Sequence, residues 1–169
     1  LDMDFDPDHE GHWGWTTYEI IDKLPEWQEN YTADIALVHA GSNDCKRPNS
    51  ANDTVEQLKN IIDLLRTDNS KMVILLAKII PWNNVGINKN IDELNSQMDQ
   101  IATDKSTMTS PVIIVDQNTG FDEVSDTFDG IHPNESGEEK MAAKWYEAIQ
   151  SIVIPTSVED HSSIFPEKS

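Results

Sequence analysis

Two short motifs carry the residue types that an acyl-transfer reaction needs. In the segment Asp-Gly-Ile-His at 129–132, one turn of chain can bring the Asp129 carboxylate to one nitrogen of the His132 imidazole. The other ring nitrogen then faces a substrate, which is the arrangement of an acid–base pair. In the segment Gly-Ser-Asn-Asp at 41–44, the Asn43 amide can donate a hydrogen bond to a developing oxyanion. No serine stands in the setting expected of a nucleophile.

Both motifs also have a purely structural interpretation. An aspartate and a histidine at this spacing are common in the turn that starts a helix, and Pro133 with the helix start behind it makes the catalytic interpretation more specific here. Asn43 or Asp44 can instead close an Asx-type turn that only caps the loop. Asp44 is expected to organise its loop as an acceptor rather than to act as an acid.

The segment 8–15 is dense in histidines, carboxylates and tryptophans. Its spacing is not that of the helical H-E-x-x-H zinc motif, so no metal site is expected. Its glycines favour a turn that directs a peptide N–H into the site. Trp13 and Trp15 could stack on a sugar ring, and one of the two is expected to be a core residue instead. The candidate substrate-binding tryptophans are Trp13 and Trp82. His39, inside an apolar run, is expected to be a core histidine whose hydrogen bonds are satisfied.

Charge and cysteine content narrow the possible functions. The 169 residues include 31 Asp and Glu against 12 Lys and Arg, a formal net charge of −19. Such a field repels phosphate backbones and anionic lipid surfaces, so neither nucleic acid nor a membrane is an expected partner. The single cysteine, Cys45, excludes an internal disulfide and a cysteine-based zinc site and is expected to be a passive loop thiol. No cofactor is expected, and the acidity favours an extracellular or periplasmic setting.

Three continuously apolar runs, at 35–40, 72–80 and 112–115, predict buried parallel strands. Helical stripes separate and follow them: Val55, Leu58, Ile62 and Leu65; Ile87, Ile91, Leu94, Met98 and Ile101; Met141, Trp145, Ile149 and Ile152. A first helix is expected near Thr16 and should end at Pro25, and Ser136 with Glu139 predicts a capping box for the last one.

This alternation of strand and helix predicts a parallel α/β sheet in residues 1–154, followed by a polar tail at 155–169. Chemistry in such sheets lies at the carboxyl ends of the strands. The loops at 41–44, 82–84 and 129–132 all leave those ends, so we expect them to meet at one edge of the sheet.

The motifs together resemble those of the SGNH (GDSL-type) hydrolases, with the closest likeness to the carbohydrate-esterase branch that includes acetyl xylan esterases. The resemblance implies a flavodoxin-like three-layer α/β/α sandwich with sheet order 2-1-3-4-5. It implies that the Gly14 N–H and the Asn43 side chain are oxyanion donors, that His132 is the general base and that Asp129 orients it. The implied substrate is a small acyl ester or an acylated carbohydrate.

The sequence departs from this family at the nucleophile. The Gly-Asp-Ser block that carries the family's serine is absent, and Ser42 fits only by position. The first two strands of the family fold are also expected to be missing. Four explanations stay open: a truncated chain, a separate segment, a partner chain that completes the site, or a loss of catalysis. The nucleophile is therefore unknown.

These explanations leave two main functions, an esterase and a non-catalytic sugar- or acyl-binding module on the same scaffold. A nucleotide-binding module is disfavoured because no strand is followed by a phosphate-cradling loop. Without its family neighbours, the strand at 35–40 would be an open edge. We therefore expect association through that edge, with a second copy or with a segment that carries the missing strands.

Overall fold

The computed structural model describes residues 9–153, so the predicted tail at 155–169 lies outside the described residues. Its sheet contains β1 (Ile35–Val38), β2 (Val73–Ala77) and β3 (Val112–Val115) in the order β1-β2-β3, and both pairings are parallel. The parallel sheet and its sequential order are as predicted. The first two strands are shorter than their apolar runs because burial continues past the ladder: Ile79 and Ile80 are buried beyond the end of β2.

Four α-helices and a short 3₁₀ helix accompany these strands in the described part of the chain. They are α1 (Thr17–Trp27), η1 (Asp44–Lys46), α2 (Ala51–Asp68), α3 (Val85–Lys105) and α4 (Glu135–Val153). The prediction that Pro25 ends the first helix is wrong. Pro25 lies in the last turn of α1, where its missing N–H removes only one helical bond, and the N–H of Gln28 still donates to the Leu24 carbonyl at 3.1 Å.

The start of α4 also differs from its predicted cap. Asn134, rather than Ser136, accepts from a first-turn amide, that of Gly137, at 3.2 Å. The Ser136 hydroxyl instead donates to the buried Asp126 carboxylate at 3.0 Å. Asp126 also pairs with Lys140 at 2.6 Å, and this contact holds its pKa below the usual value. The beginning of α4 is thus fastened to the loop in front of it by polar contacts.

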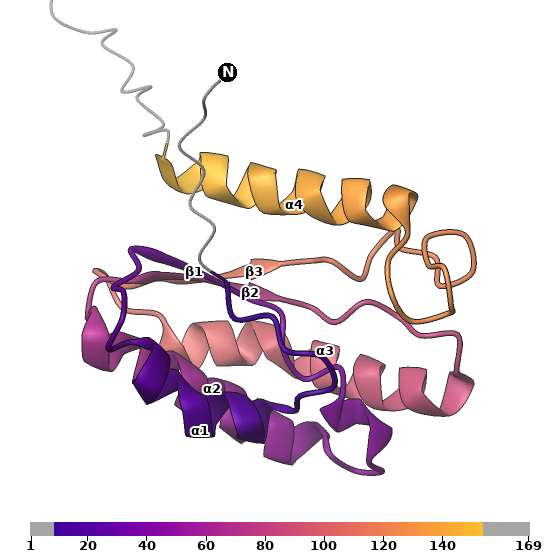
Figure 1. Ribbon diagram of the computed structural model, residues 1–169, viewed down its shortest axis with the longest axis horizontal. Coiled ribbons are helices and arrows are strands. Elements are labelled where there is room, and N and C mark those ends of the chain that lie inside the picture. The colour runs from indigo at the N-terminus through magenta and orange to yellow at the C-terminus, as the bar shows by residue number, and fades with distance from the viewer. Residues whose placement is uncertain (1–8, 154–169) are drawn as a thin grey trace, which may run out of the picture.

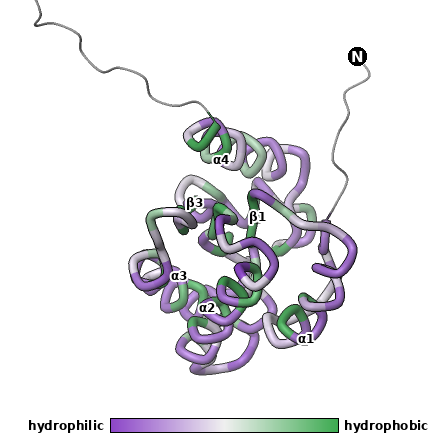
Figure 2. The backbone as a smooth tube through the Cα atoms, turned by 90° about the vertical axis from the view of Figure 1, so that its left-hand side faces the viewer, coloured by the Kyte–Doolittle hydropathy of each residue, from purple (hydrophilic) through white to green (hydrophobic). Residues whose placement is uncertain are grey.

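The elements form three layers, with α1, α2 and α3 on one face of the sheet and α4 on the other (Figure 1). The same separation is visible from the side (Figure 2). Side chains on the three-helix face are fully buried; they include Leu58, Ile62, Ile74, Leu76, Ile91, Leu94, Met98 and Ile101. This core fixes the sheet, and the sheet in turn fixes the loops at its carboxyl end.

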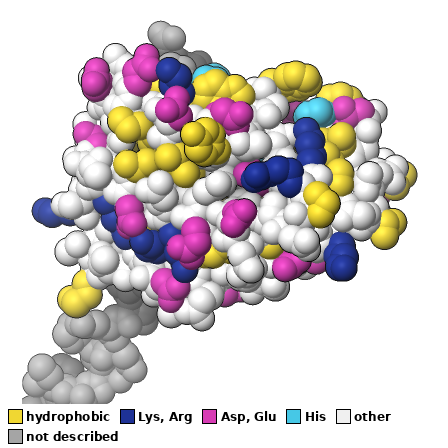
Figure 3. Space-filling view, turned by 90° about the horizontal axis from the view of Figure 1, so that it is seen from below, with side chains coloured by type: hydrophobic (Ala, Val, Ile, Leu, Met, Phe, Trp, Pro, Cys, Tyr) yellow, Lys and Arg dark blue, Asp and Glu magenta, His cyan; other side chains and the backbone are white. Residues whose placement is uncertain are grey.

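The surface is rich in charged side chains, as the composition predicts. On the face seen from below, acidic side chains are scattered among lysines and arginines and do not gather in one patch (Figure 3). None of the helices in the described residues combines the length and apolarity that a membrane crossing requires. Within the same residues β1 pairs with β2 alone, which leaves its outer edge open, and Leu37 in this strand is 46 % exposed.

Candidate active site

Asp129 and His132 form a hydrogen-bonded pair. Oδ2 of Asp129 lies 2.7 Å from Nδ1 of His132, and Oδ1 accepts from the backbone N–H groups of His132 at 2.8 Å and Ile131 at 3.0 Å. The backbone N–H of His132, then its ring, hold the pKa of Asp129 below the usual value. The aspartate is therefore ionised at neutral pH, and it leaves Nε2 as the free nitrogen of a half-exposed imidazole.

The loop that carries this pair is held in shape by its own backbone. The N–H of Phe128 donates to the His132 carbonyl at 3.0 Å, beside an isolated antiparallel bridge between Thr127 and Pro133. Gly130 turns the chain with a φ of 85°, in the left-handed region, and donates its N–H to the Thr127 hydroxyl at 2.9 Å. These contacts hold the backbone of the loop in one conformation.

The loop after β1 meets the segment before α1. Nδ2 of Asn43 donates to the Trp15 carbonyl at 2.9 Å, which places the Asn43 amide next to Gly14 in the chain. An amide carries two N–H protons, so a second one remains for a substrate oxygen. Gly14 has a φ of 79°, in the left-handed region, as the predicted turn requires.

Asp44 joins the same two segments more firmly. Its side chain is fully buried and accepts from both the N–H and the hydroxyl of Thr17, at 3.0 and 2.8 Å. Thr17 is the first residue of α1, where a carboxylate also interacts favourably with the helix dipole. The predicted part of Asp44, a loop-organising acceptor, is what these bonds show.

The loops after β1, β2 and β3 are also in contact. The indole N–H of Trp82 donates to Oγ of Ser42 at 2.9 Å, and the N–H of Asn83 donates to the Gly130 carbonyl at 2.7 Å. No hydrogen bond within residues 9–153 joins Ser42 to His132, so Ser42 has no base beside it. Hydrogen bonds and short stretches of chain thus connect Trp15 to the acid–base pair, and the predicted convergence of these loops is confirmed.

The two tryptophans predicted to bind substrate differ in exposure. Trp13 is 89 % exposed, whereas Trp82 is 5 % exposed and lies under the Lys46 ammonium, 5.3 Å from the ring centroid. The prediction of sugar stacking fits the surface of Trp13, whereas burial leaves Trp82 with little free face. The contact with Ser42 instead gives Trp82 a part in shaping the site.

Two buried side chains behave differently from each other. Nε2 of His39 is buried without a hydrogen-bond partner among the described residues, so the prediction of a satisfied histidine is wrong. Burial lowers the pKa of His39 to about 4. Cys45 is fully buried, and burial followed by the Asp44 charge raises the pKa of its thiol to about 12, which keeps it protonated and unreactive.

The side chains of the histidine-rich segment pack against neighbouring aromatic and carboxylate groups. His12 stacks on Trp15 and Trp27, with ring centroids 4.1 and 4.9 Å apart, and its Nε2 lies 3.1 Å from Glu10. Glu10 also accepts from the Tyr31 hydroxyl at 3.1 Å. Residues 9–153 contain no group of three His, Cys, Asp or Glu side chains placed to hold a metal ion.

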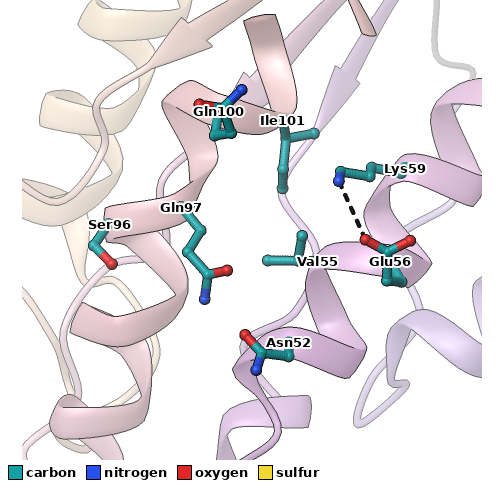
Figure 4. A pocket seen from close by; sticks show the side chains of 8 residues that line it. All are labelled: Asn52, Val55, Glu56, Lys59, Ser96, Gln97, Gln100 and Ile101. Atoms are coloured by element: carbon teal, nitrogen blue, oxygen red, sulfur yellow. Dashed lines mark hydrogen bonds and ion pairs between the residues drawn. The ribbon is translucent and has the colours of Figure 1, made fainter. Parts of the chain in front are cut away.

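A separate hollow of about 320 Å³ lies between α2 and α3. The apolar side chains of Val55 and Ile101 project into it, and carboxamides and the Lys59–Glu56 ion pair stand around them (Figure 4). None of the candidate catalytic residues lines this hollow, so it is distinct from the site described above.

Sequence reasoning missed one residue of the site. The ring of Phe128 is 71 % exposed and stacks on the His132 imidazole, with centroids 5.7 Å apart and planes inclined by 17°. Its place directly before Asp129 was the available signal. Spacing alone does not tell whether such an aromatic side chain turns toward the histidine or away from it.

The sequence is similar to those of two curated proteins. A multidomain esterase from Ruminococcus flavefaciens is 28 % identical over 167 residues, which cover 88 % of this chain but 21 % of that protein. The chain covers 55 % of a second curated relative, so it spans well under two thirds of the length of both.

Solved structures of esterases share the fold. An acetyl esterase crystallised as a serine-to-alanine mutant with an acetate ion is 28 % identical, with a TM-score of 0.80 over 88 % of this chain and 72 % of the other. A family 3 carbohydrate esterase from Clostridium thermocellum is 28 % identical, with a TM-score of 0.72 over 87 % and 71 %. Residues 4–140 match the model of the GDSL-like lipase/acylhydrolase family. The chain therefore belongs to the GDSL-like lipase/acylhydrolase family.

Proposed function

We propose that this chain carries the acid–base and oxyanion part of a serine esterase that hydrolyses short acyl esters, acetyl-like in size, on carbohydrate. The observation that carries the proposal is the hydrogen-bonded Asp129–His132 pair, tied through neighbouring loops to Asn43 and Gly14. A histidine with one nitrogen oriented and the other free, next to fixed amide donors, is the machinery of acyl transfer.

Each residue has a defined task in this reaction. Nε2 of His132 takes the proton of a serine hydroxyl while that oxygen attacks the ester carbonyl. The Gly14 N–H and the Asn43 amide hold the resulting oxyanion, and the imidazolium, stabilised by Asp129, then protonates the departing alcohol oxygen. Water attacks the acyl-enzyme by the same route and releases the acid. In this proposal the serine is carried by a Gly-Asp-Ser block, which this sequence does not contain and which another segment has to supply.

The relatives support this choice of substrate. The acetyl esterase with bound acetate and the family 3 carbohydrate esterases share the fold and 28 % of the sequence. A net charge of −19 favours a neutral alcohol over an anionic one. The exposed Trp13 lies beside Gly14 in the chain and offers a flat surface to a sugar ring. Because polymeric carbohydrate is found outside cells, we place the protein in an extracellular or periplasmic setting.

The open edge of β1 is the proposed site of association. Its outer N–H and C=O groups have no strand partner in the described part of the chain, and the apolar Leu37 is 46 % exposed there. Such an edge readily accepts another strand. We propose that it pairs with a serine-bearing segment or, in its absence, with a second copy. Light scattering that shows only monomer at micromolar concentration, together with a cooperative melt, would contradict this.

Activity and labelling test the function together. The purified protein is assayed on acetylated xylo-oligosaccharide and treated with a serine-reactive phosphonate, and intact mass identifies the labelled chain. His132→Ala should lower kcat by about 10²–10⁴-fold, since this is what a general base contributes. His9→Ala, which removes an exposed histidine away from the acid–base pair, is the matched control and should leave kcat unchanged.

Two results would count against the esterase. If the protein binds the oligosaccharide but neither hydrolyses it nor takes up phosphonate, the non-catalytic binding module is the better description. If His132→Ala and His9→Ala behave alike in an active preparation, the acid–base assignment is wrong.

A further inference from the structure

Phe128 is an exposed aromatic side chain on a firmly held loop. The ring is 71 % exposed, although burying a phenylalanine is worth about 1.5–3 kcal/mol. Isolated exposed apolar residues are common, and Val124 in the same connection is 70 % exposed. Phe128 differs from Val124 because it has a defined neighbour: its ring stacks on the imidazole of His132.

The backbone holds Phe128 opposite His132. The N–H of Phe128 donates to the His132 carbonyl at 3.0 Å, so the two residues face each other across a narrow turn. The preceding Thr127 accepts from Nδ2 of Asn134 at 3.2 Å and bridges to Pro133. The planes of the phenyl and imidazole rings differ by 17° and their centroids lie 5.7 Å apart, which describes an offset stack. Because Phe128 is 71 % exposed, much of its ring stays free for a ligand beside the stacked imidazole.

The acid–base chemistry defines which part of an ester reaches that surface. Nδ1 of His132 is engaged by Asp129, so Nε2 alone can deliver a proton to the leaving oxygen. The alcohol is bonded directly to that oxygen, whereas the acyl chain extends from the carbonyl carbon. The alcohol is therefore the part of the substrate nearest to His132, and hence to the ring beside it.

We infer that Phe128 is a substrate-contact residue that stacks against the alcohol part of the ester, a neutral sugar ring, while His132 protonates its leaving oxygen. The inference rests on the proposed function and adds a binding surface to it. The face of an aromatic ring is electron-rich and attracts the C–H side of a pyranose. Asp129 and the overall charge of −19 disfavour a carboxylated or sulfated sugar at the same place.

The kinetic test compares two esters that share the acetyl group and differ only in the alcohol: acetylated xylotriose and ethyl acetate. Phe128→Ala should lower kcat/KM for acetylated xylotriose about 5- to 10-fold, mainly through KM, which is the size of one aromatic contact. For ethyl acetate it should change kcat/KM less than about twofold, because ethanol offers no ring to stack. Phe128→Tyr keeps the flat face and should retain most of the activity, and Val124→Ala is the matched control.

Equal losses on both esters would overturn the inference, because Phe128 would then act by holding His132 in place. Unchanged kinetics on both esters would overturn it as well. Binding of unmodified xylotriose is a second readout that needs no turnover, followed through the NMR signals of the His132 ring. Binding that Phe128→Ala weakens supports the sugar contact even if no ester is cleaved, in which case only the proposed esterase function fails. If the parent protein does not bind xylotriose, the sugar contact is wrong whatever the activity.

Discussion

The two faces of the sheet differ in how completely their side chains are buried. On the face covered by α1, α2 and α3, Leu58, Ile74 and Met98 have no exposed surface. On the other face α4 stands alone, and in its described part only Gly137 is buried. Leu37 on β1 points to this second face and is nearly half exposed, whereas its neighbour Ala36 points to the first face and packs against the core.

The three-helix face is packed entirely within this chain, whereas the other face has exposed apolar surface that a second chain or segment could cover. The three-helix face supplies a continuous core and holds the loops of the site. The α4 face buries Leu75 and Ala77 of β2 but leaves Leu37 of β1 half exposed, and the outer edge of β1 is open in the described residues. Apolar surface next to an open edge marks a place of association.

The largest expected effect comes from deleting core volume on the closed face. Leu58→Ala should lower the free energy of unfolding by about 2–5 kcal/mol, because a fully buried leucine leaves a cavity. Leu37→Ala removes the same atoms from the open face and should cost less than about 1 kcal/mol in the monomer. Urea denaturation measures both. A cost for Leu37→Ala that rises with protein concentration would show that Leu37 is covered by another chain.

A glycine pair tests how firmly α4 is attached. A Cβ on Gly137 would lie 2.2 Å from the Asp126 carbonyl oxygen, so Gly137→Ala should lower stability by about 1–3 kcal/mol through overpacking. Gly86, in the first turn of α3, has its nearest contact at 3.4 Å, and Gly86→Ala should be neutral or stabilising by up to about 1 kcal/mol. Thermal melts of the two variants give the comparison. Equal melting temperatures would mean that the start of α4 yields easily.

The smallest effect is a pH dependence from His39, two residues beyond Leu37. Its folded pKa of about 4 lies below the unfolded value of 6.5, so the unfolded state binds more protons between these values. The stability contributed by the neutral His39 is fully present above pH 6.5 and is lost as the pH falls from 6.5 toward 4. Urea midpoints at pH 7 and pH 5 should therefore differ less for His39→Leu than for the parent protein. Identical pH dependence of the two proteins would mean that His39 is not the group responsible.

The elements and the convergence of the loops could be predicted because they depend on local pattern and on the direction of parallel strands. Continuous apolar runs located all three strands, and their order placed the loops together. Three details could not be read this way. Pro25 lies inside α1 because a proline in a last turn costs one bond, and Asn134 takes the cap because Ser136 bonds to Asp126. Nε2 of His39 has no partner among the described residues, and no local sequence pattern signals this.

Gly130 limits how the acid–base motif can drift in evolution. A side chain there would need a left-handed backbone, and its Cβ would lie 2.9 Å from the Cβ of Asn83. Gly130 has no side chain to take part in the reaction, yet it is harder to replace than many of the residues around it. Random substitution of position 130 followed by selection for folded, active protein should return glycine alone.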